Sequence, residues 1–230
     1  MTPDCVVAVG AHPDDAEFFA GATLGNFAAK GAKVFVVICT DGARGGAEAG
    51  AALAELRRVE AERAALALGI RPPILLGRAD GALEADEPLR RDLVRELRRL
   101  RPTLVLLHDP STWWTPLRER TQLGHSDHRA AGQATLDALY PRLLLAGFYP
   151  ELAAEGLSPW FAREAWLFDT AAPDHFVPVE EPGAAAKRGA LSCHESQHVG
   201  GLLRGAAEIE EAFGKPLGVP AEAFRRLVLF

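Results

Sequence analysis

The composition of this 230-residue chain is that of an ordinary globular protein. Hydrophobic residues make up 48% and charged residues 24%, which excludes a disordered or fibrous chain. With 25 Lys and Arg against 31 Asp and Glu, the formal net charge is −6. This charge argues against nucleic acid or an anionic lipid surface as a partner.

The first half of the chain alternates between strand-like and helix-like patterns. Short apolar runs predict strands at 6–10, 33–40, 73–77 and 103–108. Helical periodicity predicts helices at 16–30, 52–68, 88–100 and 127–140. This alternation, with strands that are apolar on both faces, predicts a Rossmann-like α/β fold with a mostly parallel sheet and helices on both faces.

The pattern is looser after residue 150, where strands are expected at 165–169 and 176–179. A helix is expected at 184–196, followed by a final apolar run at 226–230. No linker, repeat or change of composition interrupts the chain, so we expect one domain over residues 1–230. The long polar loops at 41–50 and 109–124 are of the kind that usually carries function.

Targeting and redox features are sparse in the sequence. The apolar run at 5–9 has no basic segment before it, and no stretch approaches the ~20 apolar residues of a membrane span. We therefore expect a cytoplasmic protein that does not engage a membrane. Cys5, Cys39 and Cys193 have neither zinc-ribbon nor redox spacing.

Titratable residues follow each of the first four predicted strands. They are His12, Asp14 and Asp15 after the first, Asp41 after the second, Asp80 after the third, and His108 and Asp109 after the fourth. Because the carboxyl ends of parallel strands meet at one edge of a sheet, we expect these side chains to gather there. The turn at 10–15 lacks the glycine pattern of a dinucleotide site and carries two carboxylates instead, which favours a metal cation.

Two short motifs have the composition of a metal site. In the first, His12 and Asp15 would converge on one ion while Asp14 faces its open side, although Pro-Asp-Asp is also a common helix start. The second, at 125–128, reads His-Ser-Asp-His and is alternatively a capped helix start with two surface histidines. Together the motifs supply two imidazoles and a carboxylate, which is a ligand set for catalytic Zn²⁺ with one position left to water. Fe²⁺ or Co²⁺ would also suit these ligands.

The two motifs, at 11–17 and 125–128, resemble those of the PIG-L/LmbE-like family of zinc-dependent N-deacetylases. Weaker similarities lie at 40–42, 57–60, 80–81 and 187–197, so the resemblance covers most of the chain. It implies one Zn²⁺ per chain, held by His12, Asp15 and His128. It also implies that Asp14 is the general base, that a protonated His125 stabilises the oxyanion, and that Asp127 orients His125. Substrate contacts would come from Arg57, Asp80 and His194.

The function implied is hydrolysis of the N-acetyl group of a small N-acetylglucosamine-type molecule. Amide hydrolysis needs an activated water and a stabilised oxyanion, which a zinc site with a nearby carboxylate and imidazole can supply. Two alternatives are an amidohydrolase for another N-acyl compound and a non-catalytic nucleotide-binding module with a structural metal. Some relatives suggest a homo-oligomer, and Trp113 or Trp114 is a candidate wall of a saccharide site.

Overall fold

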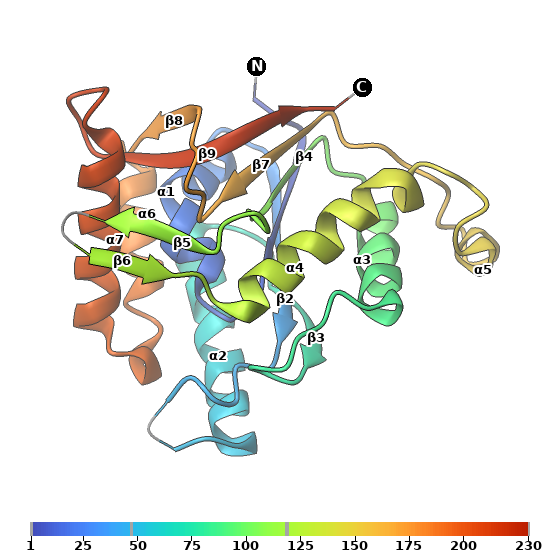
Figure 1. The fold of residues 1–230 in the computed structure, drawn as a ribbon, viewed down its shortest axis with the longest axis horizontal. Helices are drawn as coiled ribbons and strands as arrows, with labels where there is room; N and C mark the ends of the chain where they lie inside the picture. The colour runs from blue at the N-terminus through green and yellow to red at the C-terminus, as the bar shows by residue number, and fades with distance from the viewer. Residues whose placement is uncertain (1, 47, 118–119, 230) are drawn as a thin grey trace.

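A seven-stranded sheet forms the centre of the molecule in the computed structural model, which describes residues 2–46, 48–117 and 120–229 (Figure 1). Its strands run in the order β3-β2-β1-β4-β7-β9-β8. Their bounds are β1 Cys5–Gly10, β2 Lys33–Thr40, β3 Ile74–Arg78, β4 Leu104–His108, β7 Glu164–Phe168, β8 His175–Pro178 and β9 Ala221–Val228. The first five strands of this order are parallel, whereas β9 is antiparallel to both β7 and β8. The predicted α/β fold with a mostly parallel sheet is confirmed.

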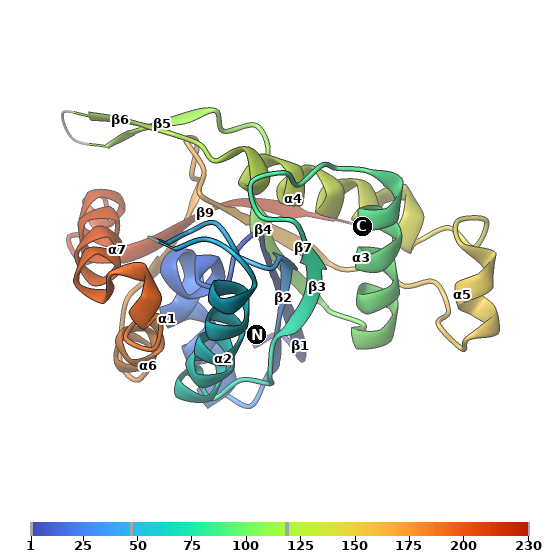
Figure 2. The same ribbon diagram turned by 90° about the horizontal axis from the view of Figure 1, so that it is seen from below.

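Helices cover both faces of the sheet because its central strands are apolar on both sides. Val6 and Ala8 of β1 face the helices α1 and α2, whereas Val7 and Val9 face α3 and α4. In Figure 2, α6 and α7 lie with α1 and α2, on the side opposite to α3 and α4. The bounds of these helices are α1 Asp15–Ala29, α2 Ala51–Leu68, α3 Glu87–Leu100, α4 Ser126–Asp137, α6 Gly183–Leu191 and α7 Val199–Gly214.

Several elements differ from the sequence-based expectation. The helix predicted at 127–140 ends with a kink at Tyr140, which precedes Pro141 and has the extended backbone angles that residues before proline favour. The segment that follows α4, Ala138–Leu143, consists of helical backbone on either side of this kink. The predicted helix at 184–196 ends at Leu191, and a short 3₁₀ turn at Glu195–Gln197 leads into α7, which the sequence patterns did not indicate.

The segment expected to be a loop at 109–124 contains an antiparallel hairpin. Its strands are β5 Trp114–Leu117 and β6 Arg120–Leu123, and Figure 2 shows them projecting from the body of the molecule. A short helix, α5 Pro150–Ala154, lies in another stretch expected to be irregular. The last strand, β9, begins at Ala221 rather than at residue 226. Among the described residues, no helix combines the length and apolarity needed to cross a bilayer.

A buried ionic cluster ties the last strand to the first helix. Lys187 of α6 contacts the carboxylates of Glu210 in α7, at 2.5 Å, and Glu222 in β9, at 2.7 Å. Glu222 also accepts hydrogen bonds from the backbone amides of Ala22 and Thr23 in α1, at 2.9 and 2.8 Å. These contacts fix α1, and hence the start of α1 at the sheet edge, against the C-terminal elements.

Candidate metal and active site

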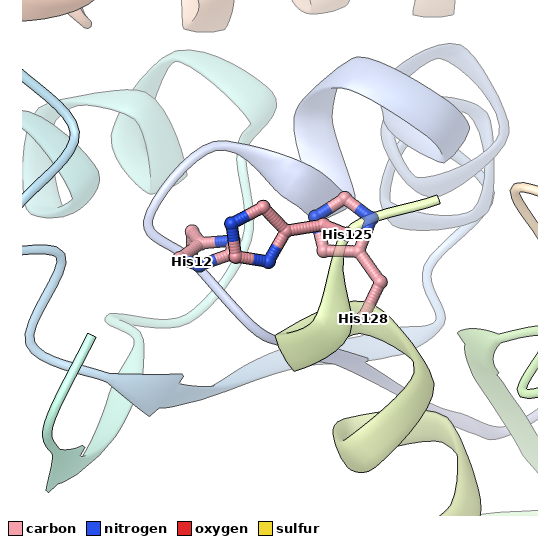
Figure 3. Close-up of side chains that lie close together, drawn as sticks. All are labelled: His12, His125 and His128. Carbon is pink, nitrogen blue, oxygen red and sulfur yellow. The ribbon is translucent and has the colours of Figure 1, made fainter. Parts of the chain in front are cut away.

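Three histidines from two distant segments lie side by side at the carboxyl ends of the parallel strands (Figure 3). His12 follows β1, and His125 and His128 lie at the N-terminus of α4. The ring centre of His12 is 4.7 Å from that of His125 and 5.3 Å from that of His128. The fold therefore brings together the two motifs that the sequence analysis singled out.

The carboxylate of Asp15, at the start of α1, lies between two of these rings. Its Oδ2 is 3.5 Å from Nδ1 of His12, and its Oδ1 is 3.2 Å from Nε2 of His128. In a tetrahedral site with metal–ligand bonds of 2.0–2.1 Å, neighbouring ligand atoms are about 3.3 Å apart. Both distances are close to this spacing, and donor atoms of His12 and His128 also lie within 4.8 Å of each other.

The same region contains three overlapping groups of metal-ligating side chains among the described residues. Within each group the donor atoms lie within 4.8 Å of one another. The groups are His12, His125 and His128; Asp15, His108 and His128; and His12, Asp80 and Asp127. Because every group includes His12 or His128, the candidate metal position is centred near these two rings.

Carboxylates surround His12 and make its position favourable for positive charge. Nε2 of His12 is 3.2 Å from Asp80 and 3.4 Å from Asp127. Burial disfavours the charged ring, but hydrogen bonds to Asp127, Asp15 and Asp80 outweigh it and raise the pKa of His12 to about 12. Burial likewise opposes charge on His128, whose pKa is nevertheless raised to about 9, mainly by Asp15. The site favours a cation.

Arg57 of α2 pairs with Asp14, the predicted general base. Its Nη2 lies 3.2 Å from Asp14 Oδ2, and its Nη1 donates to the carbonyl oxygen of Gly42. Burial raises the pKa of Asp14, and the Arg57 guanidinium opposes that shift. Arg57 is only 2% exposed, yet it borders the same cavity as Asp14. It is therefore placed to hold Asp14.

Asp127 makes contacts that differ from the predicted one. Its carboxylate accepts hydrogen bonds from the backbone amides of Gly81, at 2.7 Å, and Leu83, at 3.4 Å, in addition to approaching His12. The backbone amide of Asp127, not its carboxylate, donates to Nδ1 of His125, at 3.1 Å. Asp127 thus holds His125 through the main chain, because both residues lie at the start of α4.

His125 also differs from the expected protonated ring. Burial lowers its pKa, and the nearby His12 and His128 lower it further. Because Nδ1 accepts a hydrogen bond, the neutral ring carries its proton on Nε2. His125 can therefore act as a neutral hydrogen-bond donor.

Of the three predicted substrate contacts, Asp80 and Arg57 line the cavity and His194 does not. The hydrogen bond with His12 is the main cause that lowers the pKa of Asp80 to about 2, so its carboxylate stays ionised. His194 is fully buried, and neither of its ring nitrogens has a hydrogen-bond partner among the described residues. Burial lowers its pKa to about 4. His194 has no exposed surface in this structure, and its contact with a substrate stays a prediction.

The site opens into a cavity that is lined mostly by polar residues. Two polar side chains that line it were not among the predicted site residues: Arg44, in the loop after β2, and Gln197. Gln197 reaches the cavity because the backbone amide and hydroxyl of Ser196 donate to Glu60 of α2, at 2.8 and 2.7 Å. The only available signal was the weak family-like segment 187–197, which ends at Gln197.

The tryptophans of the hairpin region lie elsewhere. Neither Trp113 nor Trp114 is among the described residues that line this cavity. The guanidinium of Arg129 stacks on the ring of Trp113, at 4.1 Å from its centre. The hypothesis that one of them forms a saccharide wall is therefore not supported at this cavity.

Comparisons with known proteins place this chain in one family. The family model of PIG-L, the GlcNAc-PI de-N-acetylases, matches residues 7–139. The diacetylchitobiose deacetylase of Thermococcus kodakarensis is 31% identical over 195 residues, which cover 84% of this chain and 69% of the relative. A 1D-myo-inositol 2-acetamido-2-deoxy-alpha-D-glucopyranoside deacetylase of Thermobispora bispora is 31% identical, with 80% of this chain and 64% of the relative covered.

A solved structure is similar over almost the whole chain. The N,N'-diacetylchitobiose deacetylase of Pyrococcus horikoshii, in complex with its inhibitor MPG, superposes with a TM-score of 0.84 at 27% identity. The match covers 98% of this chain and 84% of that one. The fold and cavity define an α/β protein with a candidate metal site at the carboxyl edge of its sheet. The chain belongs to the PIG-L/LmbE-like GlcNAc-PI de-N-acetylase family and is a hydrolase of this deacetylase family.

Proposed function

We propose that this protein removes the N-acetyl group from a small N-acetylglucosamine-type compound in a reaction that depends on Zn²⁺. The observation that carries the proposal is the place of the Asp15 carboxylate between His12 and His128, 3.5 and 3.2 Å from their ring nitrogens, in a cavity that Asp14 also lines. The relatives' names give the substrate class, since both curated relatives are deacetylases of acetamido sugars.

His12, Asp15 and His128 would hold the ion, with Nδ1 of His12 and Nε2 of His128 as the imidazole donors. When bound, Zn²⁺ lowers the pKa of a coordinated water to about 7 and polarises an amide carbonyl. The neighbouring carboxylates of Asp80 and Asp127 lie on the other nitrogen of His12. Their contacts would orient the His12 ring toward the ion.

Asp14 would take a proton from the attacking water and later give it to the nitrogen of the leaving amine. Its position suits this role because one carboxylate oxygen is held by Arg57 at 3.2 Å and the residue lines the cavity. His125 would donate from Nε2 to the oxygen that becomes negative in the tetrahedral intermediate. Removing one such donor has cost about 2.7–4 kcal/mol in other enzymes.

The substrate's sugar would be held by polar groups on the cavity wall. Arg44, Arg57, Asp80 and Gln197 offer both donors and acceptors there, which suits the hydroxyl groups of a monosaccharide. The acetyl group would then lie beside Asp14 and the three histidines.

The decisive experiment compares Asp14→Asn with His128→Ala. We expect Asp14→Asn to bind zinc like the wild-type protein and to lose 10²-fold or more in kcat, as removal of a general base usually does. His128→Ala should lose both zinc and turnover. Free-amine release would be measured on N-acetylated amino sugars and N-acyl amino acids, with zinc content measured in parallel.

An exposed carboxylate offers a matched control. Asp174 is exposed, and the variant Asp174→Asn should leave kcat within about twofold of the wild-type value. Unchanged kcat in Asp14→Asn would contradict the assigned base. Release from N-acyl amino acids alone would contradict the sugar substrate and leave the hydrolytic mechanism intact.

A further inference from the structure

The residue directly after β7 carries an unexplained carboxylate at the edge of the metal site. Asp169 has a backbone φ of 54°, in the left-handed region that few residues other than glycine, asparagine and aspartate adopt. Its position is fixed by the sheet, because the amide of Asp109 donates to the carbonyl oxygen of Phe168 at 2.9 Å. The chain thus holds Asp169 in this conformation at a strand end facing α4.

The contacts of Asp169 explain this conformation. Its Oδ2 lies 2.9 Å from Nδ1 of His128, while Nε2 of the same ring lies 3.2 Å from Asp15. A carboxylate on one ring nitrogen keeps the proton there and leaves the lone pair of the other nitrogen free for a metal. We propose that Asp169 is a positioning residue that fixes the tautomer and orientation of the metal ligand His128.

A second buried side chain completes the arrangement. His108, at the end of β4, is fully buried, and its ring stacks on that of His128 with centres 4.0 Å apart. Its Nε2 lies 3.0 Å from Oδ2 of Asp15, and its Nδ1 lies 3.7 Å from Oδ2 of Asp169. His108 therefore contacts both carboxylates that flank His128, the proposed ligand Asp15 and the positioning residue Asp169.

Asp109, a second buried carboxylate at this edge of the sheet, has a structural role and serves as a comparison for Asp169. Asp109 is also buried and also follows a strand, but its oxygens accept hydrogen bonds from Ser111, through its backbone and hydroxyl, and from the hydroxyl of Thr170. No histidine is among its hydrogen-bond partners in the described part of the chain. Asp109 closes a turn, whereas Asp169 holds a ligand.

The test measures metal affinity as well as activity, because the inference rests on the proposed metal site. Zinc affinity would be determined by competition with a chelator for the wild type, Asp169→Asn, Asp169→Glu and Asp109→Asn. We expect Asp169→Asn to bind zinc about 10–100-fold more weakly and Asp169→Glu to recover part of the loss. Asp109→Asn should lower the urea midpoint of unfolding but leave the zinc dissociation constant unchanged.

The visible spectrum of the Co²⁺-loaded proteins gives a readout of ligand geometry. It should change in Asp169→Asn and remain that of the wild type in Asp109→Asn. Equal zinc affinity in Asp169→Asn and wild type would overturn the inference, as would an equal loss in Asp109→Asn. If Asp169→Asn weakens zinc binding but the wild type hydrolyses no acetamido sugar, the proposed function fails while the positioning role stands.

Discussion

His194 lies wholly inside the protein, with no hydrogen-bond partner for its ring among the described residues. Burial lowers its pKa to about 4 from an ordinary value near 6.5. Between those two pH values the unfolded chain binds a proton at this position and the folded protein does not. The unfolded state therefore gains stability as the pH falls through this window.

We expect the free energy of unfolding to fall between pH 6.5 and pH 4 by up to about 3 kcal/mol through His194, with no contribution from this group above pH 6.5. His194→Leu should remove that part of the pH dependence. Urea unfolding at pH 7.5, 5.5 and 4.5 would measure it, with the exposed His198 substituted by Asn as the control. An unchanged slope in His194→Leu would contradict the assignment.

Individual site residues were predictable where they belong to a compact motif. The segments 11–17 and 125–128 each lie at the start of a helix at the same edge of the sheet. The parallel sheet therefore brings their side chains together, and the conformation of the long loops has little influence on this. Asp169 and Gln197 belong to no such motif. Asp169 acts through a left-handed backbone conformation, and Gln197 reaches the cavity through the bonds between Ser196 and Glu60. Both depend on contacts between segments that are distant in sequence.

At the scale of elements, the site depends on how closely α4 approaches the end of β4. A Cβ atom on Gly132 of α4 would lie 2.3 Å from the carbonyl oxygen of His108, so only glycine permits this contact. Because α4 also carries His125 and His128 at its N-terminus, the distance between α4 and β4 sets where these rings lie relative to Asp15.

Gly132→Ala should therefore push α4 away from β4 and disturb the metal site from a distance. We expect a loss of about 1–3 kcal/mol in the free energy of unfolding, as for overpacked cores, together with weaker zinc binding. Gly189→Ala is a matched control in α6, because a Cβ there meets only Ala67, at 3.7 Å. This control should stabilise the protein by about 0.5–1 kcal/mol, and equal zinc affinity in both variants would contradict the prediction.

Elements were predictable where hydrophobic pattern and turn signals agree. Strands β1 to β4 are short apolar runs separated by helical segments, so their alternation was visible. The hairpin β5–β6 was missed because a proline at position 116 and polar residues interrupt its pattern. Helix α7 was missed because Gly200, Gly201 and Gly205 weaken its helical signal. Charged residues at 225 and 226 likewise concealed the length of β9.

At the scale of the whole molecule, the candidate site joins segments from across the sheet. The proposed ligands and their supports follow β1, β4 and β7 or begin α1 and α4. An ion bound there would link these elements only in the folded state. Strands from both halves of the chain share the sheet, and we therefore propose that residues 1–230 form one domain.

Zinc should consequently stabilise the folded protein. At a free zinc concentration 100 times the dissociation constant, we expect about 2.7 kcal/mol of added stability, and a chelator should remove it. Thermal unfolding across a zinc series would measure the effect in the wild type and in His128→Ala. A zinc-dependent rise in Tm of equal size in His128→Ala would show that the ion stabilises the protein from another site.

The link between Glu222 and α1 has a consequence for biosynthesis. The carboxylate of Glu222 accepts a hydrogen bond from the amide of Ala22, which lies 200 residues earlier in the chain. A ribosome that adds about 5–20 residues per second therefore makes Glu222 roughly 10–40 s after Ala22. In the last part of that interval, after residues 164–168 have been made, the strand β7 lacks its neighbour β9 and has an open edge. The contacts between Glu222 and α1 thus form only late in translation. Until then we expect the newly made chain to need protection by chaperones.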